Sequence, residues 1–254
     1  MEERKQTVFR EVVIIGAGWS GLLACKSMLE EGLTAVTLEK RPDVGGLWNY
    51  TDDPSIITVM KNTKTTSSST VTEMSDFPMP EEIGQFPKQE DVLSYLKSYC
   101  DAFDLWPHIR LGHCVIEITK ADKFWRVRCE NEQLFESKFL VICTGSVQKP
   151  NRELEHTIFR DFVGEVRHSS ELKSFVPEHE NKRVMLIGGG ETASDIVEEY
   201  YDHVTRIVWC IPRGMHFFRK YAKILPNRRP QALDKASSRV MKSIAPFTKG
   251  KPGE

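Results

Sequence analysis

Short apolar runs followed by glycine-rich turns occur twice along this chain. Residues 11–15 form a β-rich run, a turn with three glycines follows, and residues 19–31 have the spacing of a helix that ends at Gly32. A further apolar run over 33–38 completes the unit. The same order returns in the second half as an apolar run, a glycine turn, a helix and another run, at residues 183–187, 188–190, 192–201 and 205–211. Each series predicts a β-α-β unit.

The region between the two units contains alternating rather than continuous apolar positions. Residues 115–119 and 124–129 alternate like strands, and the run 139–145 is apolar until it reaches Thr144 and Gly145. We therefore expect an α/β fold with two Rossmann-like dinucleotide-binding domains, the first with a small antiparallel β excursion and both incomplete.

The first glycine turn has the full context of a dinucleotide-binding fingerprint. Gly16, Gly18 and Gly21 form G-x-G-x-x-G between a strand and a helix, and Glu39 follows directly after the next apolar run. Such a turn admits a pyrophosphate at the helix N-terminus, and an acid at this spacing binds a ribose hydroxyl. The predicted contacts are Gly16, Ala17, Gly18, Trp19, Ser20, Gly21 and Glu39.

The residues after Glu39 favour FAD as the ligand of this turn. Gly45 and Gly46 permit a second close backbone approach, which suits the larger FAD better than NAD. The end of the 139–145 run faces the same cofactor in this interpretation. The added predicted contacts are Gly46, Leu47, Trp48, Thr144 and Gly145, although simple core packing also explains Trp48.

The second glycine turn differs at the end of its following strand. Gly188, Gly190 and Ala193 form G-x-G-x-x-A, and Arg213 occupies the place after the next strand where the first unit has an acid. Arginine pairs with a 2′-phosphate, so this turn is predicted to prefer NADPH over NADH. The alternative is that Arg213 is a solvated charge at a strand end. With FAD at one turn and NADPH at the other, the chain is expected to pass a hydride between them.

Several motifs resemble those of flavin-containing monooxygenases. Phe162, Gly164 and His168 match F-x-G-x-x-x-H, and the stretches GGLWNY, EMSDFPMP (73–80) and KRVMLIGGGETASDI (182–196) are also similar to that family. The resemblance covers roughly residues 10–215. It implies an FAD- and NADPH-dependent enzyme that uses molecular oxygen to add one oxygen atom to a soft nitrogen or sulfur of a small molecule. His168 is expected to be a structural hydrogen-bonding residue rather than a catalytic base.

Three departures from the family pattern leave alternatives open. Leu172 replaces the aromatic residue that ends the signature. A Baeyer–Villiger monooxygenase, which oxidises ketones, shares the F-x-G-x-x-x-H core and is the alternative enzyme, but it usually has tryptophan at that end, so Leu172 fits neither group. Glu191 to Ala193 replace the usual small or amide residues of the second turn. The family's asparagine near the flavin, the candidate catalytic position, corresponds to Asn62 or to Thr66, depending on a gap.

Composition and charge exclude several other classes. Six scattered cysteines include no C-x-x-C pair, which argues against a disulfide reductase and a metal site, and Cys143 and Cys210 are expected to be buried. No apolar run reaches the roughly 20 residues of a membrane helix. A cytoplasmic location is expected, or the cytosolic face of the endoplasmic reticulum if a longer form carries an anchor. Residues 213–254 contain eleven Lys/Arg and two Asp/Glu. The basic tail over 225–254 is expected to be a solvated terminus that binds no nucleic acid, and contact with anionic lipid or nucleic acid is the alternative.

The predicted organisation has four parts. They are an FAD-binding domain (1–150), a connector (151–181), a partial NADPH-binding domain (182–224) and a basic tail (225–254) with a helix-like stretch over 232–244. The chain stops about forty residues after Arg213, so we expect a fragment, a truncated isoform or a pseudoenzyme, and poor coupling of NADPH oxidation to oxygen transfer.

Overall fold

The computed structural model describes residues 7–153, 157–211, 213–214, 219–222, 231–232 and 234. These residues divide into two compact units, the first from 1–59 and 92–173, the second from 60–91 and 174–254. Residues 60–91, which sequence analysis assigned to the first domain, thus group with the second. The predicted tail and its helix-like stretch lie outside the described residues, except for 231, 232 and 234.

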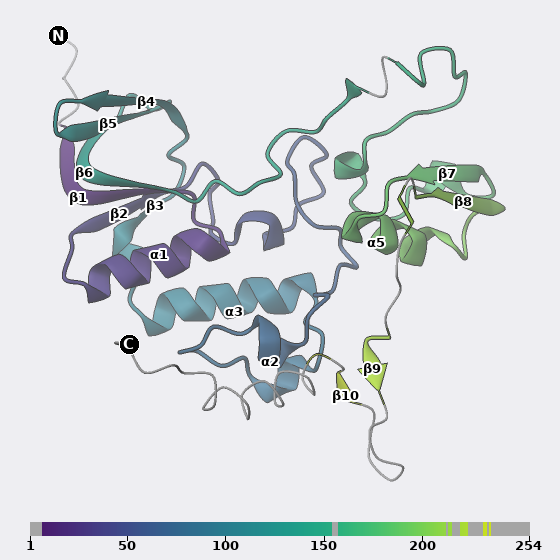
Figure 1. Ribbon diagram of the computed structural model, residues 1–254, viewed down its shortest axis with the longest axis horizontal. Helices are drawn as coiled ribbons and strands as arrows, with labels where there is room; N and C mark the ends of the chain where they lie inside the picture. The colour runs from purple at the N-terminus through teal and green to yellow at the C-terminus, as the bar shows by residue number, and fades with distance from the viewer. Residues whose placement is uncertain are drawn as a thin grey trace, which may run out of the picture. The chain divides into compact units, whose positions relative to one another are not determined.

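A six-stranded mixed sheet forms the first unit (Figure 1). Its order is β3-β2-β1-β6-β5-β4; β3, β2, β1 and β6 run parallel, and β6, β5 and β4 pair antiparallel. The strands are β1 (Val8–Ile15), β2 (Ala35–Leu38), β3 (Ile109–Arg110), β4 (Val115–Ala121), β5 (Phe124–Cys129) and β6 (Leu134–Ile142). The antiparallel excursion is therefore continuous with the parallel sheet through β6.

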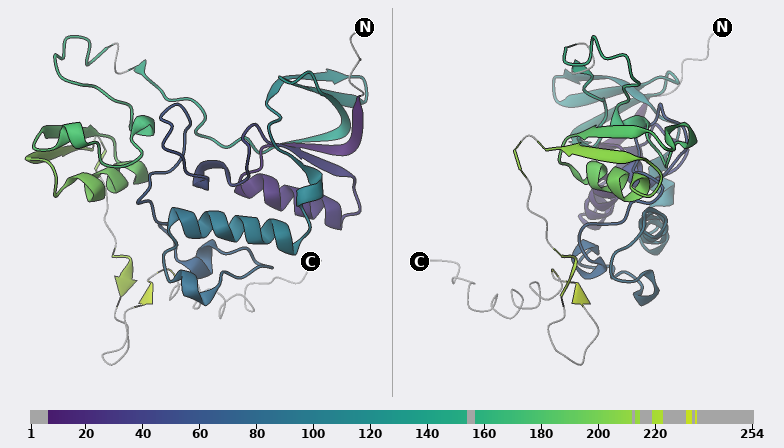
Figure 2. Two further views of the ribbon diagram at one scale, coloured as in Figure 1. Left: turned by 180° about the vertical axis from the view of Figure 1, so that it is seen from behind. Right: turned by 90° about the vertical axis from the view of Figure 1, so that its right-hand side faces the viewer.

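Two helices cover one face of this sheet. In both figures α1 (Trp19–Glu30) and α3 (Gln89–Ala102) lie side by side, and Trp19 packs against Tyr95 with ring centroids 5.8 Å apart (Figures 1 and 2). On the other face, Val13 and Ile15 of β1 pack in a core with Val127 and Cys129 of β5, because alternate residues of a strand face opposite sides. The glycine turn between β1 and α1 therefore follows the carboxyl end of a strand that is packed on both faces. The unit's 3₁₀ turns are η1 (Gly46–Trp48), η3 (Trp106–His108) and η4 (Ser169–Glu171).

The second unit contains a parallel pair, β7 (Arg183–Ile187) and β8 (Arg206–Cys210), with α5 (Glu191–Tyr200) along one face (Figure 2). Ala193, Ile196 and Tyr200 form the buried side of α5. The other elements are α2 (Ser69–Thr72), η2 (Glu81–Ile83), η5 (Pro177–His179), β9 (Tyr221–Ala222) and β10 (Gln231–Ala232). Because one face of the pair lacks a covering layer among the described residues, alternate β8 residues are exposed. Cys210 is one of them, so the expectation that it is buried is wrong, and Cys143 is half-buried.

Candidate functional site

Two glycines of the first turn are required by the fold itself. Gly16 has φ +100°, and a Cβ there would lie 2.5 Å from the carbonyl oxygen of Cys143, at the end of β6. A Cβ on Gly21 would lie 1.8 Å from the carbonyl oxygen of Gly16. Both contacts are to backbone atoms, which do not move aside as a flexible side chain does, so neither position accepts a side chain.

Gly18 is different, because its own surroundings leave room for a side chain. Its φ of −78° suits any residue, and a Cβ would lie 3.5 Å from the Cα of Gly46, an ordinary contact distance. Gly46 has φ +55°, and its Cβ would lie 3.1 Å from the Cα of Gly18. We call this the Gly18–Gly46 approach. Two facing positions without side chains leave backbone surface that a phosphate group can reach, so the residues present fit a dinucleotide.

The start of α1 provides the matching hydrogen-bond donors. Gly18 is its N-cap, no side chain from the described part of the chain caps the helix, and its first turn contains no acidic residue. Ala17, Trp19 and Ser20 surround this N-terminus, which has a partial positive charge. An anion is therefore favoured here on both hydrogen-bonding and electrostatic grounds.

Glu39 lies directly against the turn, as its place in the sequence predicted. Its Oε2 accepts a hydrogen bond from the main-chain N–H of Ala17 at 2.7 Å, and its Oε1 accepts one from Arg41 N–H at 2.9 Å. The side chain is buried at the end of β2. A carboxylate has about four acceptor positions, so capacity remains for a ribose hydroxyl.

The remaining predicted contacts of the first turn are positioned by two connections. The main-chain N–H of Val59 bonds the carbonyl of Leu47 at 3.0 Å, which anchors η1, and Trp48 there is half-buried. Cys143 N–H bonds the carbonyl of Ile15 at 2.8 Å, so the exposed Thr144 and Gly145 follow β6 beside the turn. The structure thus brings together the residues predicted for the first turn.

Arg41 is a half-buried residue of this region that sequence analysis missed. Its Nη1 donates to the carbonyl of Gly46 at 3.0 Å, and its buried Nε has no hydrogen-bond partner among the described residues. Burial lowers the pKa of the guanidinium, and the charges of Glu39 and Asp43 oppose that shift. The basic residues after Glu39 were the only available signal in the sequence.

The second turn is open where the first is crowded. Gly188 has φ +118°, and its N–H bonds the carbonyl of Cys210 at 3.0 Å. Apart from each glycine's chain neighbours, no atom of the described residues lies within 4 Å of a Cβ built on Gly188 or Gly190. Gly190 caps α5 without a side-chain hydrogen bond, and Ala193 is buried. Glu191, however, places an acidic side chain in the first turn of this helix.

Arg213 is exposed in a turn just beyond β8. It has neither a hydrogen bond nor an ion pair with the residues that the structure describes. Gly188 N–H and the carbonyl of Cys210 join the ends of the two strands, so Arg213 follows the strand beside the second turn. This position is compatible with both the phosphate-binding and the solvated-charge interpretations.

The two candidate catalytic positions have different environments. Asn62 is half-buried; its Nδ2 donates to the carbonyl of Asp195 on α5 at 3.3 Å, whereas its Oδ1 is buried and has no partner among the described residues. Thr66 is exposed. An unpaired buried acceptor costs free energy, so Asn62 is the position at which a ligand hydrogen bond would be most useful.

A second contact beside Asn62 was not predicted. Thr63 donates its hydroxyl hydrogen to Asp195 Oδ2 at 2.6 Å and accepts a bond from Met60 N–H at 3.0 Å. Burial raises the pKa of the Asp195 carboxyl, as do Glu198 and Glu191 to a lesser extent, while Thr63 and Lys220 lower it. These contacts attach residues 60–64 to α5 within the second unit.

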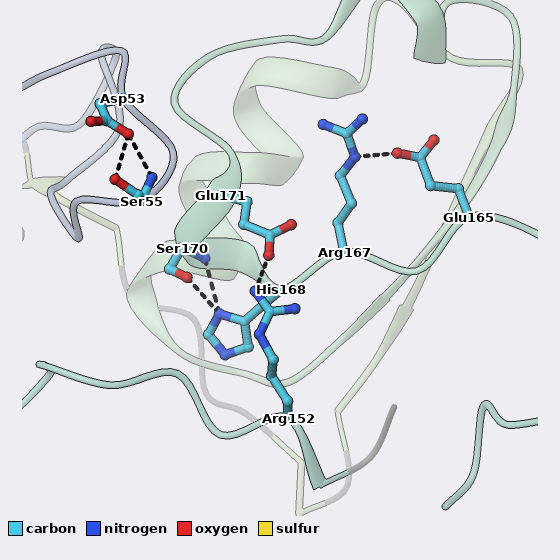
Figure 3. A network of polar contacts seen from close by, with 8 residues as sticks. All are labelled: Asp53, Ser55, Arg152, Glu165, Arg167, His168, Ser170 and Glu171. Atoms are coloured by element: carbon cyan, nitrogen blue, oxygen red, sulfur yellow. Dashed lines mark hydrogen bonds and ion pairs between the residues drawn. The ribbon is translucent and has the colours of Figure 1, made fainter. Parts of the chain in front are cut away.

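The F-x-G-x-x-x-H segment is held by local polar contacts (Figure 3). His168 caps η4, because its Nδ1 accepts a hydrogen bond from Ser170 N–H at 3.2 Å; the same atom lies 2.8 Å from the Ser170 hydroxyl. Arg152 pairs with Glu171, and Arg167 pairs with Glu165. The structural interpretation of His168 agrees with these contacts.

Neither a metal-binding cluster of His, Cys, Asp or Glu side chains nor a helix of the length and apolarity that a bilayer requires occurs in the described part of the chain.

Comparison with known proteins assigns the family. The model of the flavin-binding monooxygenase-like family matches residues 9–224, which include both glycine turns. The chain belongs to this family. The match confirms the resemblance to flavin-containing monooxygenases that the motifs indicated.

Curated relatives of this family member are about twice as long. It is 33% identical over 248 residues to human flavin-containing monooxygenase 1, covering 87% of this chain and 46% of the relative. It is 33% identical over 252 residues to human dimethylaniline monooxygenase [N-oxide-forming] 4, covering 86% and 44%. The chain thus spans less than half the length of these relatives.

Solved structures share the fold at lower identity. The S-allyl-L-cysteine S-oxygenase of Allium sativum has a TM-score of 0.67 and 23% identity, covering 89% of this chain and 55% of that one. The cyclohexanone monooxygenase of Rhodococcus sp. Phi1, bound to NADP⁺, has a TM-score of 0.57 and 22% identity, covering 96% and 45%.

Proposed function

We propose that the chain binds FAD at the first glycine turn. The Gly18–Gly46 approach carries this proposal. The fold alone leaves room for a side chain at Gly18, whereas a bound diphosphate would need that space. The uncapped start of α1 and the carboxylate of Glu39 support the same ligand at its phosphate and ribose groups.

NADPH is proposed as the ligand of the second turn. The open surface at Gly188 and Gly190 and the exposed Arg213 support this assignment, since a guanidinium pairs with a 2′-phosphate. Glu191 in the first turn of α5 opposes it electrostatically. NADPH is therefore expected to bind through Arg213 rather than through the helix N-terminus alone.

The proposed reaction is the transfer of one oxygen atom from molecular oxygen to a soft nitrogen or sulfur of a small molecule. FAD, when bound, supplies the electron transfer and oxygen activation. The chain's residues position both cofactors and exclude water, and the unpaired Asn62 Oδ1 supports Asn62, rather than Thr66, as the polar residue of the reaction site. The names of the relatives, an N-oxide-forming enzyme and an S-oxygenase, support nitrogen and sulfur as acceptors.

The test uses the purified chain reconstituted with FAD and supplied with NADPH and oxygen. A tertiary amine, a thioether and a cyclic ketone are offered separately, and the oxygenated products are identified by mass. N-oxide or S-oxide formation supports the proposal. Conversion of the ketone alone to a lactone would replace it by Baeyer–Villiger oxidation, and absence of flavin binding would contradict it.

A further inference from the structure

We propose that Arg41 is a positioning residue that supplies positive charge for the FAD diphosphate at the Gly18–Gly46 approach. The inference rests on the proposed FAD site and adds a residue that the fingerprint does not contain. Arg41 connects two parts of that site: its Nη1 donates to the carbonyl of Gly46 at 3.0 Å, and its main-chain N–H donates to Glu39 Oε1 at 2.9 Å.

The charge of Arg41 is not neutralised by an ion pair. Within the described residues, no carboxylate oxygen lies within ion-pair distance of its guanidinium. Asp43, the nearby acid, pairs instead with Lys97 at 2.6 Å. Glu39 directs its two oxygens to main-chain N–H groups. A half-buried cation without an ion pair is costly, because the charges of Glu39 and Asp43 offset only part of the burial that lowers the pKa of Arg41.

The guanidinium of Arg41 lies beside the position proposed for the diphosphate. One hydrogen bond joins it to Gly46, whose Cα faces Gly18 at the N-cap of α1. Its buried Nε has no partner among the described residues, so the guanidinium retains unused donor capacity beside the turn. A diphosphate bound at the turn would offset the unpaired charge, since Coulomb attraction is strong where water is partly excluded.

A merely structural arginine and a charge-supplying arginine give different signatures. If Arg41 acts through its charge, Arg41→Met removes an unfavourable group from the apo chain and a favourable one from the complex. The apo chain should then be as stable as the parent or more stable, while the dissociation constant for FAD rises about tenfold to a hundredfold. A structural role would lower both stability and affinity.

The experiment measures urea unfolding of the FAD-free chain and FAD affinity by quenching of flavin fluorescence, at low and high salt. Arg41→Met should show weaker FAD binding with a flatter salt dependence, because one phosphate-directed charge is lost. Arg41→Lys keeps the charge but loses the arginine geometry, so its affinity for FAD should lie between that of the parent and that of Arg41→Met. Lys123→Met in the turn between β4 and β5, which removes one exposed charge, should match the parent.

The outcomes separate this inference from the function on which it rests. FAD binding by the parent with equal affinity in Arg41→Met would overturn the role of Arg41 and leave the FAD site intact. Loss of apo stability in both Arg41→Met and Arg41→Lys would also overturn it, because the residue would then be structural. Failure of the parent to bind FAD would overturn the proposed function and this inference together.

Discussion

The glycines of the first turn give the sharpest test of the proposed site, because they are predicted to fail in different ways. Gly18→Ala adds one methyl group at a backbone with φ −78° and ψ −173°, which alanine adopts without strain. The new Cβ lies 3.5 Å from the Cα of Gly46, so the fold accommodates it. Gly21→Ala instead places a Cβ 1.8 Å from the carbonyl oxygen of Gly16, so the backbone must move.

The magnitudes follow from these contacts. Replacing an N-cap glycine by alanine costs about 0.5–1 kcal/mol, and the lower entropy of the unfolded chain returns about 0.4–1 kcal/mol. Gly18→Ala should therefore change the free energy of unfolding of the FAD-free chain by less than about 1 kcal/mol. Gly21→Ala should lower it by about 3 kcal/mol or more, at the upper end of the range for overpacking.

The affinity for FAD should distinguish Gly18→Ala from the parent even though the two chains have similar stability. The Gly18 methyl group occupies surface that the diphosphate needs, and losing charge-assisted hydrogen bonds worth about 1.5–3 kcal/mol weakens binding roughly tenfold to a hundredfold. Gly18→Val should abolish retention of FAD. Urea unfolding and flavin fluorescence measure the two quantities separately. If Gly18→Ala binds FAD as the parent does, or unfolds as readily as Gly21→Ala, the reasoning fails.

Three further predictions concern the rest of the chain. Arg213→Ala should weaken NADPH binding roughly tenfold to a hundredfold while leaving NADH nearly unchanged, as measured by titration of each nucleotide; equal losses would favour the solvated-charge interpretation. Because burial raises the pKa of Asp195, folding binds a proton there, and its ionisation destabilises the fold above that pKa. The stability of Asp195→Asn relative to the parent should therefore rise with pH from about 4 to the folded pKa of Asp195 and then level off; urea unfolding at several pH values tests this, and a decrease would contradict it. At pH 8 a thiol reagent should modify the exposed Cys210 first, whereas Cys100, whose pKa burial raises to about 12, should react only after unfolding; Cys210→Ser should remove the fast phase, and a fast phase that persists would contradict the prediction.

Local pattern predicted the elements with continuous apolar runs. The strand over 183–187 is observed with the expected bounds, and α1 ends one residue before the expected end. β6 begins five residues earlier than the apolar run 139–145 indicated, because Glu136 and Lys138 interrupt the pattern. In the sheet these polar residues pair across strands, with Arg126 and Glu11 respectively, so alternation rather than apolarity defines that half of the strand.

Contacts between residues far apart in the chain could not be predicted from the sequence. The spacing of Glu39 predicted its position at the turn, since a strand-turn-helix-strand unit has nearly fixed geometry. Nothing local connects Thr63 with Asp195, 132 residues apart, and their hydrogen bond depends on how the second unit packs. Sequence analysis missed Arg41 for a related reason, because its hydrogen bond to Gly46 and the unpaired Nε among the described residues are visible only in the structure.

The pairing of β1 with β6 has a consequence for how the chain folds during synthesis. On one side β1 pairs with the next strand in sequence, through Val12 and Ala35. On its other side Val12 lies opposite Phe139, which is translated about half a chain length later, and Cys143 beyond it packs against Gly16. At synthesis rates of about 5–20 residues per second, the chain between Val12 and Phe139 takes roughly 6 to 25 seconds to appear.

Until then the first glycine turn has been translated but lacks its contact with β6 and Cys143, and one edge of β1 is unpaired. We therefore expect this unit to fold late, with the high contact order of a slow-folding topology, and a nascent chain to acquire affinity for a dinucleotide only after β6 has left the ribosome.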